Sequence, residues 1–431
     1  MMEIEKLYAL LGPAPTVTTD TRDCSAGSVF FALRGAKFDG NAFALQALRA
    51  GCAYAVVDDP AVTGDERLIH VPDVLTALQQ VAACHRRRLG LPVVQITGTN
   101  GKTTTKELTS AVLARKFKVL STAGNFNNHI GVPKTLLCLR ADHQIAVVET
   151  GANHPGEIAT LSRIVDADCG LITNVGKAHL EGFGSFEGVI RTKGELYDYL
   201  RTKPGAFIFL HGDNPYLPKI AAGLPAVTYG EPGHGYTVEG DVLACSPFVE
   251  LRWRCAGCDW QHVHTRLVGA YNLANVLAAA AVGTRFGVAP EEISAAIAAY
   301  EPTNSRSELV KTDRNELIVD AYNANPTSMK AALDNFRLMA HGHKMVILGE
   351  MLELGAASAE EHRNVVAQAQ TLGCDAVWLV GENFRPYAGG CDFFPDVEAV
   401  KQRLQARPVS GKLILVKGSN GTRLYQLPAL L

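Results

Sequence analysis

Short apolar runs alternate with longer segments of helical period along most of the chain, and turn-forming residues separate them. Runs such as residues 93–96 and 145–148 are apolar throughout, which is typical of strands buried on both faces of a parallel sheet. Their alternation with helices predicts an α/β protein whose helices cover mostly parallel sheets. The expected strands are residues 28–32, 53–57, 93–96, 145–148, 170–173, 207–210, 317–319, 345–348, 376–380 and 413–416. The expected helices are residues 43–48, 272–286, 291–300, 328–339, 359–372 and 397–404.

The chain divides into three such blocks, as expected for 431 residues at roughly 150 residues per domain. We expect an N-terminal domain over residues 1–88, a central domain over 89–302 and a C-terminal, Rossmann-like domain over 303–431. The basic cluster at residues 85–88 stands before a glycine and a proline and is predicted to be the first linker. An irregular stretch at residues 232–260 indicates antiparallel strands added to the central domain.

Composition and charge narrow the function classes. With 47% hydrophobic and 19% charged residues, the chain is expected to be globular rather than disordered. The formal net charge of -2 gives no overall positive field, so we expect neither nucleic acid nor an anionic membrane as a partner. The first residues carry early acidic side chains and no long apolar run, so we expect no secretory signal. No stretch approaches the roughly 20 apolar residues of a membrane span. Ten scattered cysteines are typical of reduced thiols, so we expect a cytoplasmic protein.

The strongest candidate for chemistry is a glycine loop between the expected strand 93–96 and a helix. Strand, loop, Lys102-Thr103 and helix come in the order of a phosphate-binding loop. Lys102 can reach the β- and γ-phosphates of a nucleoside triphosphate, and Thr103 can reach Mg²⁺. The spacing departs from the usual G-x-x-x-x-G-K-[ST], since Ile96 stands where the first glycine would be, and a structural turn is the alternative. The residues expected to bind ATP are Gly98, Thr99, Asn100, Gly101, Lys102, Thr103 and Thr104.

Two further polar residues follow expected strands and should reach the same sheet edge as this loop. Glu149 ends the run 145–148, where a carboxylate could bind Mg²⁺, although an ordinary turn or N-cap carboxylate is the alternative. His179 comes shortly after the strand 170–173 and, taken alone, is more typical of a hydrogen-bonding histidine than of a metal ligand.

A Cys-x-x-Cys pair invites a zinc interpretation. Cys255 and Cys258 are followed closely by His262 and His264, but zinc sites usually separate their ligand pairs by a dozen or more residues. The alternation of residues 249–267 favours a hairpin with two unbonded thiols.

Two segments of the C-terminal block leave structural and functional interpretations open. Residues 322–326, Tyr-Asn-Ala-Asn-Pro, are ordinary helix-start residues that could also form a polar platform for nucleotide or peptide groups. Lys417 and Ser419 follow the expected strand 413–416 and could form an anion-binding loop.

Together, these motifs resemble those of the Mur ligases over nearly the whole chain. Thr-Gly-Thr-Asn-Gly-Lys-Thr-Thr at residues 97–104 has the short spacing of that family, and Asn-Phe-Asn-Asn at 125–128 is also similar. Residues 19–22 and 33–40 look like the family's UDP-sugar-binding segment. The segments 320–326 and 348–355 are similar to those of the members that add D-alanyl-D-alanine.

The resemblance implies a central ATP-binding domain with a mostly parallel, phosphate-loop sheet, flanked by an N-terminal α/β UDP-binding domain and a C-terminal Rossmann-like α/β domain. It implies an ATP-dependent amide ligase that makes a peptidoglycan precursor. ATP would phosphorylate the terminal carboxylate of UDP-N-acetylmuramoyl-tripeptide, and the amine of D-alanyl-D-alanine would attack the acyl phosphate. The implied catalytic residues are Lys102, Glu149, His179 and Lys193, and the implied Mg²⁺ ligands are Thr103, Glu149, His179 and a carbamylated Lys193.

The resemblance also assigns nucleotide and substrate contacts. Asn275, Arg306 and Asp320 match positions around the adenine, the γ-phosphate and the ribose. Sites divided among domains imply closure over the substrates. The implied substrate-binding residues are Thr21, Arg22, Arg34, Asp39, Gly40, Asn127, Asn128, Tyr322, Asn323, Asn325, Lys417 and Ser419.

Two alternatives to this function stay open. One is another amide ligase of the superfamily, such as a folylpolyglutamate synthase, which would not need a UDP-type segment. The other is a nucleotide-binding regulator without ligase activity, because a phosphate loop indicates binding rather than turnover. The joint presence of Glu149, His179 and Lys193 disfavours the regulator. We expect the ligase to act as a monomer.

Overall fold

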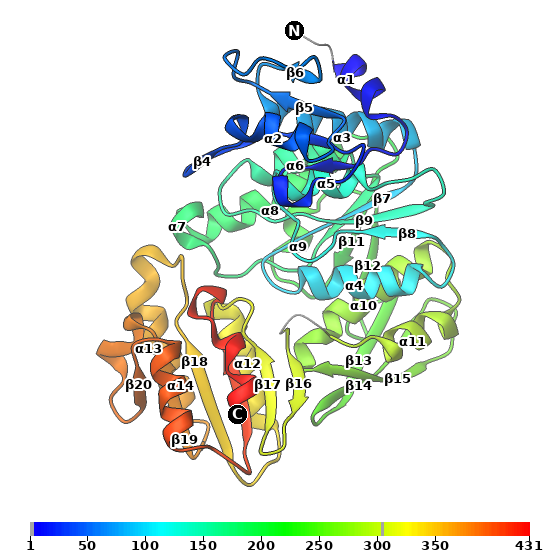
Figure 1. Cartoon of the computed structure of the whole chain (residues 1–431). Helices are drawn as coiled ribbons and strands as arrows, with labels where there is room; N and C mark the ends of the chain where they lie inside the picture. The colour runs from blue at the N-terminus through cyan, green and yellow to red at the C-terminus, as the bar shows by residue number, and fades with distance from the viewer. Residues whose placement is uncertain (1–3, 303–305) are drawn as a thin grey trace.

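The structure is a computed structural model that describes residues 4–302 and 306–431, and it contains three domains, each built around its own sheet (Figure 1). The N-terminal domain has a four-stranded parallel sheet in the order β1-β2-β5-β6. Helix α2 packs on one face of this sheet, and α1 and α3 pack on the other. Its elements are α1 (Ile4–Leu11), β1 (Val17–Thr18), β2 (Val29–Phe31), β3 (Arg34–Gly35), β4 (Phe38–Asp39), α2 (Ala44–Arg49), β5 (Tyr54–Val57), β6 (Leu68–His70) and α3 (Val74–Leu89).

The central domain has a nine-stranded sheet in the order β15-β14-β13-β12-β11-β10-β7-β9-β8. The seven strands β7 to β13 run parallel to their neighbours, except that β13 is antiparallel to β14. Strands β14 and β15 are antiparallel additions at one edge of the sheet. Its strands are β7 (Val93–Thr97), β8 (Val119–Ser121), β9 (Ile145–Glu149), β10 (Cys169–Ile172), β11 (Phe207–His211), β12 (Ala226–Gly230), β13 (Val238–Cys245), β14 (Phe248–Cys255) and β15 (Gln261–Val268). Its helices are α4 (Lys102–Leu113), α5 (Gly131–Leu137), α6 (Glu157–Val165), α7 (Leu180–Phe183), α8 (Phe186–Arg201), α9 (Leu217–Ile220), α10 (Leu273–Arg285) and α11 (Pro290–Ala299).

Both faces of the central sheet are covered, which explains why its strands are apolar throughout. Alternate residues of β9 show this, because Ala146 and Val148 pack with α5, α6 and α8 whereas Ile145 and Val147 pack with α4, α10 and α11. Helix α3 of the N-terminal domain joins the first of these cores. The N-terminal domain is therefore fixed on the central domain by a shared apolar core.

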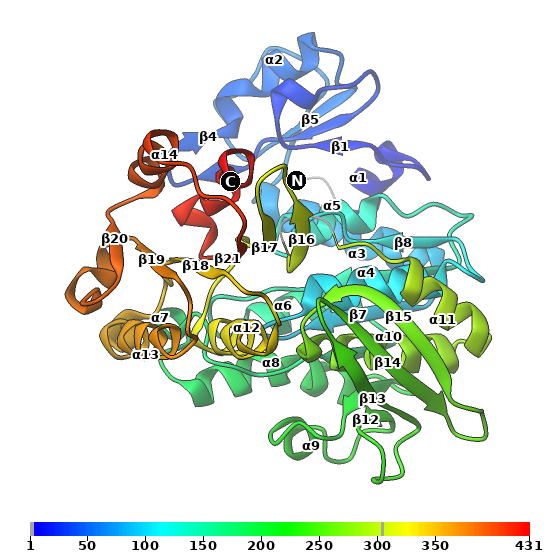
Figure 2. The same ribbon diagram turned by 90° about the horizontal axis from the view of Figure 1, so that it is seen from below.

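The C-terminal domain has a six-stranded sheet in the order β16-β17-β21-β18-β19-β20, in which only the edge strand β16 is antiparallel. Helices α12 and α13 cover one face and α14 covers the other. It meets the central domain at α7, which contacts residues 355–357 (Figure 2). Its elements are β16 (Glu308–Lys311), β17 (Glu316–Asp320), α12 (Pro326–Leu338), β18 (Lys344–Gly349), α13 (Ser358–Gln370), β19 (Ala376–Val380), β20 (Asp392–Phe394), α14 (Val397–Ala406) and β21 (Leu413–Lys417).

The predicted fold class is confirmed, and every strand expected from an apolar run is present within one or two residues. The domain boundaries at residues 88/89 and 302/303 stay predictions, and residue 303 itself lies outside the described residues. In the described ranges, no helix is long and apolar enough to cross a membrane.

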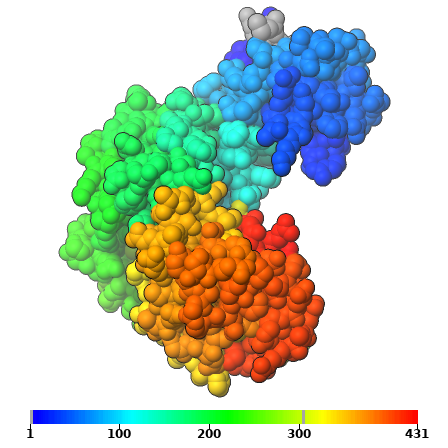
Figure 3. Space-filling model, turned by 90° about the vertical axis from the view of Figure 1, so that its left-hand side faces the viewer, coloured from blue at the N-terminus to red at the C-terminus, as the bar shows by residue number. Residues whose placement is uncertain are grey.

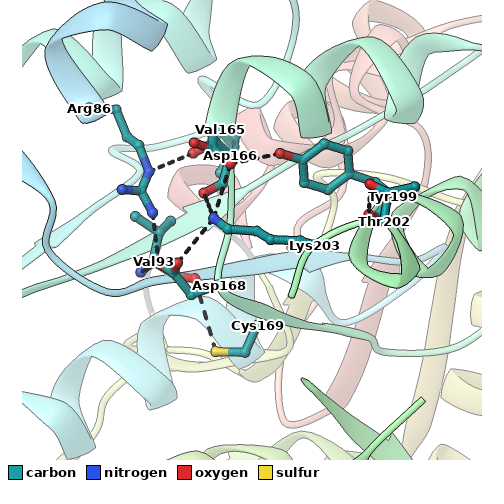
Figure 4. Close-up of polar contacts among 9 residues, drawn as sticks. All are labelled: Arg86, Val93, Val165, Asp166, Asp168, Cys169, Tyr199, Thr202 and Lys203. Atoms are coloured by element: carbon teal, nitrogen blue, oxygen red, sulfur yellow. Dashed lines mark hydrogen bonds and ion pairs between the residues drawn. The ribbon is translucent and has the colours of Figure 1, made fainter. Parts of the chain in front are cut away.

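The prediction of a linker at residues 85–88 is wrong, because these residues form the last turns of α3. Arg86 is 4% exposed, and its guanidinium donates to the Val165 carbonyl at 3.1 Å and to Asp168 at 2.7 Å (Figure 4). Asp168 also accepts a hydrogen bond from the Val93 backbone and pairs with Lys203 at 3.0 Å. The basic residues therefore continue a helix, and the buried one among them, Arg86, is paired with Asp168 at the amino-terminal edge of the central sheet.

The predicted hairpin around the Cys-x-x-Cys pair is confirmed by the antiparallel strands β14 and β15. The two thiols were expected to be unbonded, and this is wrong, because Cys255 and Cys258 form a disulfide. The turn between them brings their Cα atoms to 5.3 Å, which is within disulfide reach. Eight other cysteines are free.

Candidate active site

The carboxyl ends of β7, β9, β10, β11 and β12 open into one cavity of about 1180 Å³. Parallel strands bring all these ends to the same edge of the sheet, where ligands bind in open α/β folds. The C-terminal domain supplies the opposite wall. The predicted residues that line the cavity are Thr99, Asn100, Gly101, Lys102, Thr103, Thr104, Asn127, Asn128, Glu149, His179, Asn275, Arg306, Asp320, Tyr322, Asn323 and Lys417.

The glycine loop runs from the end of β7 to the start of α4. Gly98 has a φ of +141°, and a Cβ there would lie 2.0 Å from the Thr173 hydroxyl, so only glycine fits. Lys102 begins α4, and its ammonium donates to the Gly98 and Thr99 carbonyls at 2.9 Å each. Burial lowers the pKa of Lys102. A cation and the free N–H groups of a helix start therefore lie together, as phosphate binding requires.

Glu149 ends β9 and is 1% exposed. Its backbone N–H donates to the Thr122 hydroxyl at 3.0 Å, and its Oε1 accepts from the Asn127 amide at 2.7 Å. Its Oε2 is buried and has no hydrogen-bond partner within residues 4–302 and 306–431. A buried carboxylate oxygen without a partner is costly. Together with the Thr103 hydroxyl at the start of α4, this oxygen fits a divalent cation that prefers oxygen ligands.

His179 lies on the loop after β10 and lines the cavity. Its Nδ1 is hydrogen-bonded to Glu353 of the C-terminal domain. Burial lowers the pKa of His179, while the Glu353 carboxylate acts in the opposite direction. With Nδ1 engaged by Glu353, Nε2 is the ring nitrogen left for a ligand.

Lys193 lies on α8, just behind the cavity rather than on its wall. It is 2% exposed, and its ammonium lies 3.4 Å from the Ala152 carbonyl and 5.3 Å from the centre of the Phe183 ring. Burial, reinforced by the charge of Lys102, lowers its pKa to about 7. Lys193 is therefore neutral in a large fraction of molecules at neutral pH, which makes its amine nucleophilic.

The C-terminal wall carries a second group of charges. Arg306 stacks on Tyr322 with its guanidinium carbon 3.9 Å from the ring centre. Its Nε is buried and lacks a hydrogen-bond partner in the part of the chain that the structure describes. Lys417 is 1% exposed and donates to Asp320 at 2.6 Å and to the Asn323 carbonyl at 3.3 Å. Lys417 thereby fixes the Asp320 carboxylate at the cavity.

Gly98, Asn325 and Ser419 are predicted site residues that do not line the cavity themselves. Asn325 is the N-cap of α12 and accepts a hydrogen bond from the Ser328 backbone at 2.9 Å. Its amide also pairs with that of Asn100 in the glycine loop. The Ser419 hydroxyl accepts from the Leu352 backbone at 3.1 Å.

The predicted residues of the N-terminal domain lie outside this cavity. Arg22 is exposed and pairs with Asp20, and Arg34 pairs with Asp58 at 3.1 Å. Asp39 caps the following turn by accepting from the Asn41 backbone at 2.9 Å. Figure 3 shows an open notch between the N-terminal domain (blue) and the C-terminal domain (orange to red) at the right of the view. Thr21 and Gly40 belong to the same domain and likewise do not line the cavity.

Several cavity residues were missed from the sequence. Asn174 follows β10, and Asp213 follows β11, at the same sheet edge as Glu149. Both residues follow an expected strand, and this signal, which pointed to Glu149, could also have pointed to them. Asn174 accepts from the Asn100 backbone at 3.0 Å, and Thr327 of α12 accepts from the Lys177 backbone at 3.1 Å. Only the packing of the two domains brings Thr327 to the central domain.

The fold and this site define a nucleotide-dependent ligase of three α/β domains. Three families match the chain: the Mur ligase family, catalytic domain, over residues 15–87, the Mur ligase middle domain over 96–283, and the Mur ligase, glutamate ligase domain, over 305–420. The chain belongs to the Mur ligase family.

Two similar proteins share the name UDP-N-acetylmuramoyl-tripeptide--D-alanyl-D-alanine ligase. The Bacillus subtilis (strain 168) protein is 37% identical over 425 residues, covering 95% of this chain and 92% of that protein. The Escherichia coli (strain K12) protein is 35% identical with the same coverage.

Solved structures agree with the sequence comparison. MurF from Acinetobacter baumannii superposes with a TM-score of 0.86 at 32% identity, covering 96% of this chain and 92% of that one. MurF ligase from Thermotoga maritima in complex with ADP has a TM-score of 0.85 at 25% identity, covering 98% and 97%. A bifunctional folylpolyglutamate synthase/dihydrofolate synthase is 18% identical with a TM-score of 0.62, which shows a shared fold.

Proposed function

We propose that this chain is an ATP-dependent ligase that joins D-alanyl-D-alanine to UDP-N-acetylmuramoyl-tripeptide, giving a pentapeptide precursor of peptidoglycan. The observation that carries the proposal is the combination of a complete phosphate-loop site with relatives of this one activity over 95% of the chain. The MurF complex with ADP supports ATP as the nucleotide. The cytoplasmic location and the monomeric state expected from the sequence stay predictions.

The domains would divide the work along the chain. The N-terminal domain, residues 1–88, would hold the UDP-sugar through Thr21, Arg22, Arg34, Asp39 and Gly40. The central domain, residues 89–302, would bind ATP through the glycine loop and Asn275, and the C-terminal domain, residues 303–431, would add Arg306 and Asp320. Tyr322, Asn323 and the central residues Asn127 and Asn128 line the same cavity and would face the peptide substrates. Asn325, Lys417 and Ser419 would support this wall through the contacts described above.

In this reaction the site residues would act by positioning the reactants and by neutralising phosphate charge. Lys102 would hold the β- and γ-phosphates while the tripeptide carboxylate attacks the γ-phosphorus and ADP leaves, giving an acyl phosphate. The dipeptide amine then attacks the acyl carbon, an amide bond forms, and phosphate leaves. Arg306, whose buried Nε lacks a partner among the described residues, is placed to neutralise charge on the transferred group. Docking of the C-terminal domain would keep water away from the acyl phosphate.

Mg²⁺ fits this donor set, since Thr103 and Glu149 offer oxygen atoms and His179 offers a ring nitrogen. The metal would neutralise phosphate charge and polarise the transferred phosphoryl group. Lys193 as an ammonium cannot bind a cation. Its lowered pKa of about 7 favours reaction of the neutral amine with CO₂, and the resulting carbamate would be an anionic ligand.

A phosphate-release assay tests the function. Release of phosphate from ATP should require both UDP-N-acetylmuramoyl-tripeptide and D-alanyl-D-alanine, with one phosphate per amide bond formed. Release that does not depend on the dipeptide would defeat the proposal. Glutamate addition to a folate in place of dipeptide addition would identify the folylpolyglutamate-type alternative.

A further inference from the structure

Two residues with left-handed backbone conformations meet at the border between the central and C-terminal domains. His179 has a φ of +49° and Glu353 a φ of +62°, although neither is a glycine. Only five non-glycine residues of the described chain have a positive φ. Such conformations are costly and persist where the surroundings hold them, often at functional sites. Their meeting in a single contact calls for an explanation.

The backbone of Glu353 is held on both sides. Met351 and Leu354 are 1% and 3% exposed and anchor the segment in the C-terminal core. The backbone N–H of Leu352 donates to Ser419 at 3.1 Å. The carbonyl of Glu353 itself accepts a hydrogen bond from the Glu181 backbone at 3.3 Å. Glu353 therefore reaches the central domain from a fixed position rather than from a free loop.

His179 is held equally well on the central side. Its carbonyl accepts from the Phe183 backbone at 3.0 Å, and its ring meets the Phe183 ring edge-on at 6.2 Å between centres. The side chain of His179 is 25% exposed, whereas that of Glu353 is 54% exposed. The imidazole is thus fixed at the cavity wall, and Glu353 approaches it from outside.

The chemistry of this contact fixes the histidine tautomer. An ionised carboxylate only accepts hydrogen bonds, so Nδ1 of His179 must carry the proton donated to Glu353. The neutral ring then has its lone pair on Nε2. Histidines that bind metals commonly donate their second ring N–H to a carboxylate, which orients the ring and raises its basicity.

We propose that Glu353 is a positioning residue that fixes the tautomer and orientation of His179 for metal binding. This inference rests on the metal role proposed for His179 above. Because Glu353 belongs to the C-terminal domain, the imidazole of His179 is oriented for the metal only when the two domains are docked. Docking and metal affinity are thereby coupled through one hydrogen bond.

The same border supplies a matched control. Lys177, two residues before His179, pairs with Glu361 of α13 at 2.7 Å. The Glu361 side chain is 9% exposed and that of Lys177 is 52% exposed, so Glu361→Ala also removes one interdomain ion pair. It does not touch the imidazole. Glu361→Ala therefore separates a general loss of docking from a loss of histidine positioning.

The test measures Mn²⁺ binding to the full-length protein with ADP by electron paramagnetic resonance. Glu353→Ala should weaken Mn²⁺ binding by about 10- to 100-fold. Glu353→Gln should stay within about threefold of the unchanged protein, because its amide oxygen still accepts from Nδ1. Glu361→Ala should lose clearly less Mn²⁺ affinity than Glu353→Ala, because it weakens docking but leaves Nδ1 of His179 its acceptor. Equal losses in Glu353→Ala and Glu361→Ala, a loss in Glu353→Gln as large as in Glu353→Ala, or no loss in Glu353→Ala would each overturn the proposal.

Ring nitrogen NMR gives a readout that needs neither metal nor turnover. At about pH 8, where an ordinary histidine is neutral, His179 should be the Nδ1–H tautomer, assigned by its loss in His179→Asn. In Glu353→Ala the Nε2–H tautomer should appear, and an unchanged spectrum would overturn the positioning role. If His179→Asn binds Mn²⁺ like the unchanged protein, the metal role in the proposed function fails instead. The two failures are thus distinguishable.

Discussion

Asn325 and Asn100 exchange side-chain hydrogen bonds across the border between the C-terminal and central domains. The Asn325 amide donates to the Asn100 oxygen at 2.7 Å, and the reverse bond measures 3.4 Å. Asn100 lies in the glycine loop, and Asn325 caps α12. The phosphate loop is therefore connected directly to the start of a C-terminal helix, so nucleotide binding and docking of this domain support one another.

Replacing Asn325 by serine should weaken ATP binding while leaving α12 intact. Serine is a good N-cap, but its hydroxyl is too short to replace the bond to Asn100. We expect the KM for ATP to rise about fivefold to tenfold, as for the loss of a net hydrogen bond of about 1 to 1.5 kcal/mol. Steady-state kinetics check this, and an unchanged KM would contradict the coupling. Asn325→Ala, which also removes the cap, should in addition lower the Tm.

Replacing Lys102 by alanine should abolish turnover without unfolding the protein. Its ammonium is the cation within the glycine loop, and removing such a group from a phosphoryl-transfer site costs at least about 100-fold in kcat. The matched control is Lys118→Ala, which changes an exposed lysine directly before β8 and should keep full activity. Retention of the full rate in Lys102→Ala would refute the phosphate-loop assignment.

The Arg86–Asp168 pair should stabilise the contact between α3 and the central sheet. Arg86 is buried, whereas the Asp168 side chain is 42% exposed, so solvent screens part of the attraction. We expect Arg86→Met to lower the free energy of unfolding by about 1 to 3 kcal/mol. Urea denaturation measures it. The neighbouring exposed Arg87→Met should change stability by less than about 0.5 kcal/mol, and equal effects of both would argue against the buried network.

Stability should fall on mild acidification because of His85. This side chain is fully buried between the Tyr8 hydroxyl at 2.9 Å and the Leu139 carbonyl at 3.0 Å, and burial lowers its pKa. Below about pH 6.5, His85 binds a proton in the unfolded chain but stays unprotonated in the folded chain, because its folded pKa is lower. The free energy of unfolding therefore falls as the pH falls, by up to about 1.4 kcal/mol per pH unit.

Denaturation of His85→Gln at about pH 7 and pH 5.5 tests this origin. The variant should be less stable at neutral pH because it disturbs a packed hydrogen-bonded site, yet its stability should depend less on pH than that of the unchanged protein. The exposed His70→Gln should keep the original pH dependence. If the stability of His85→Gln depended on pH as strongly as that of the unchanged protein, His85 would not be the cause of the pH dependence.

Part of the site could be predicted because its residues follow strands directly. Glu149 and the glycine loop sit at strand ends, and parallel strands bring such ends together whatever the rest of the fold does. The same rule applied more strictly would have found Asn174 and Asp213. Lys193 was found only through the family resemblance, because its burial on α8 comes from packing that local composition does not reveal.

The errors have equally specific causes. A basic cluster before a glycine suggested a linker, but Arg86 is buried because Asp168, distant in sequence, lies beside it. The Cys255–Cys258 pair was expected to be unbonded because spacing alone does not show how closely a hairpin turn brings two thiols together.

The sequence by itself determined the α/β class, the strands, the phosphate loop and the family, because apolar periodicity and short motifs act over a few neighbouring residues. The tertiary structure alone decided which domains share a core, that His179 meets Glu353 and that Asn100 meets Asn325. These contacts join residues 174 and 225 positions apart. They depend on the packing of whole domains, and no local pattern encodes that arrangement.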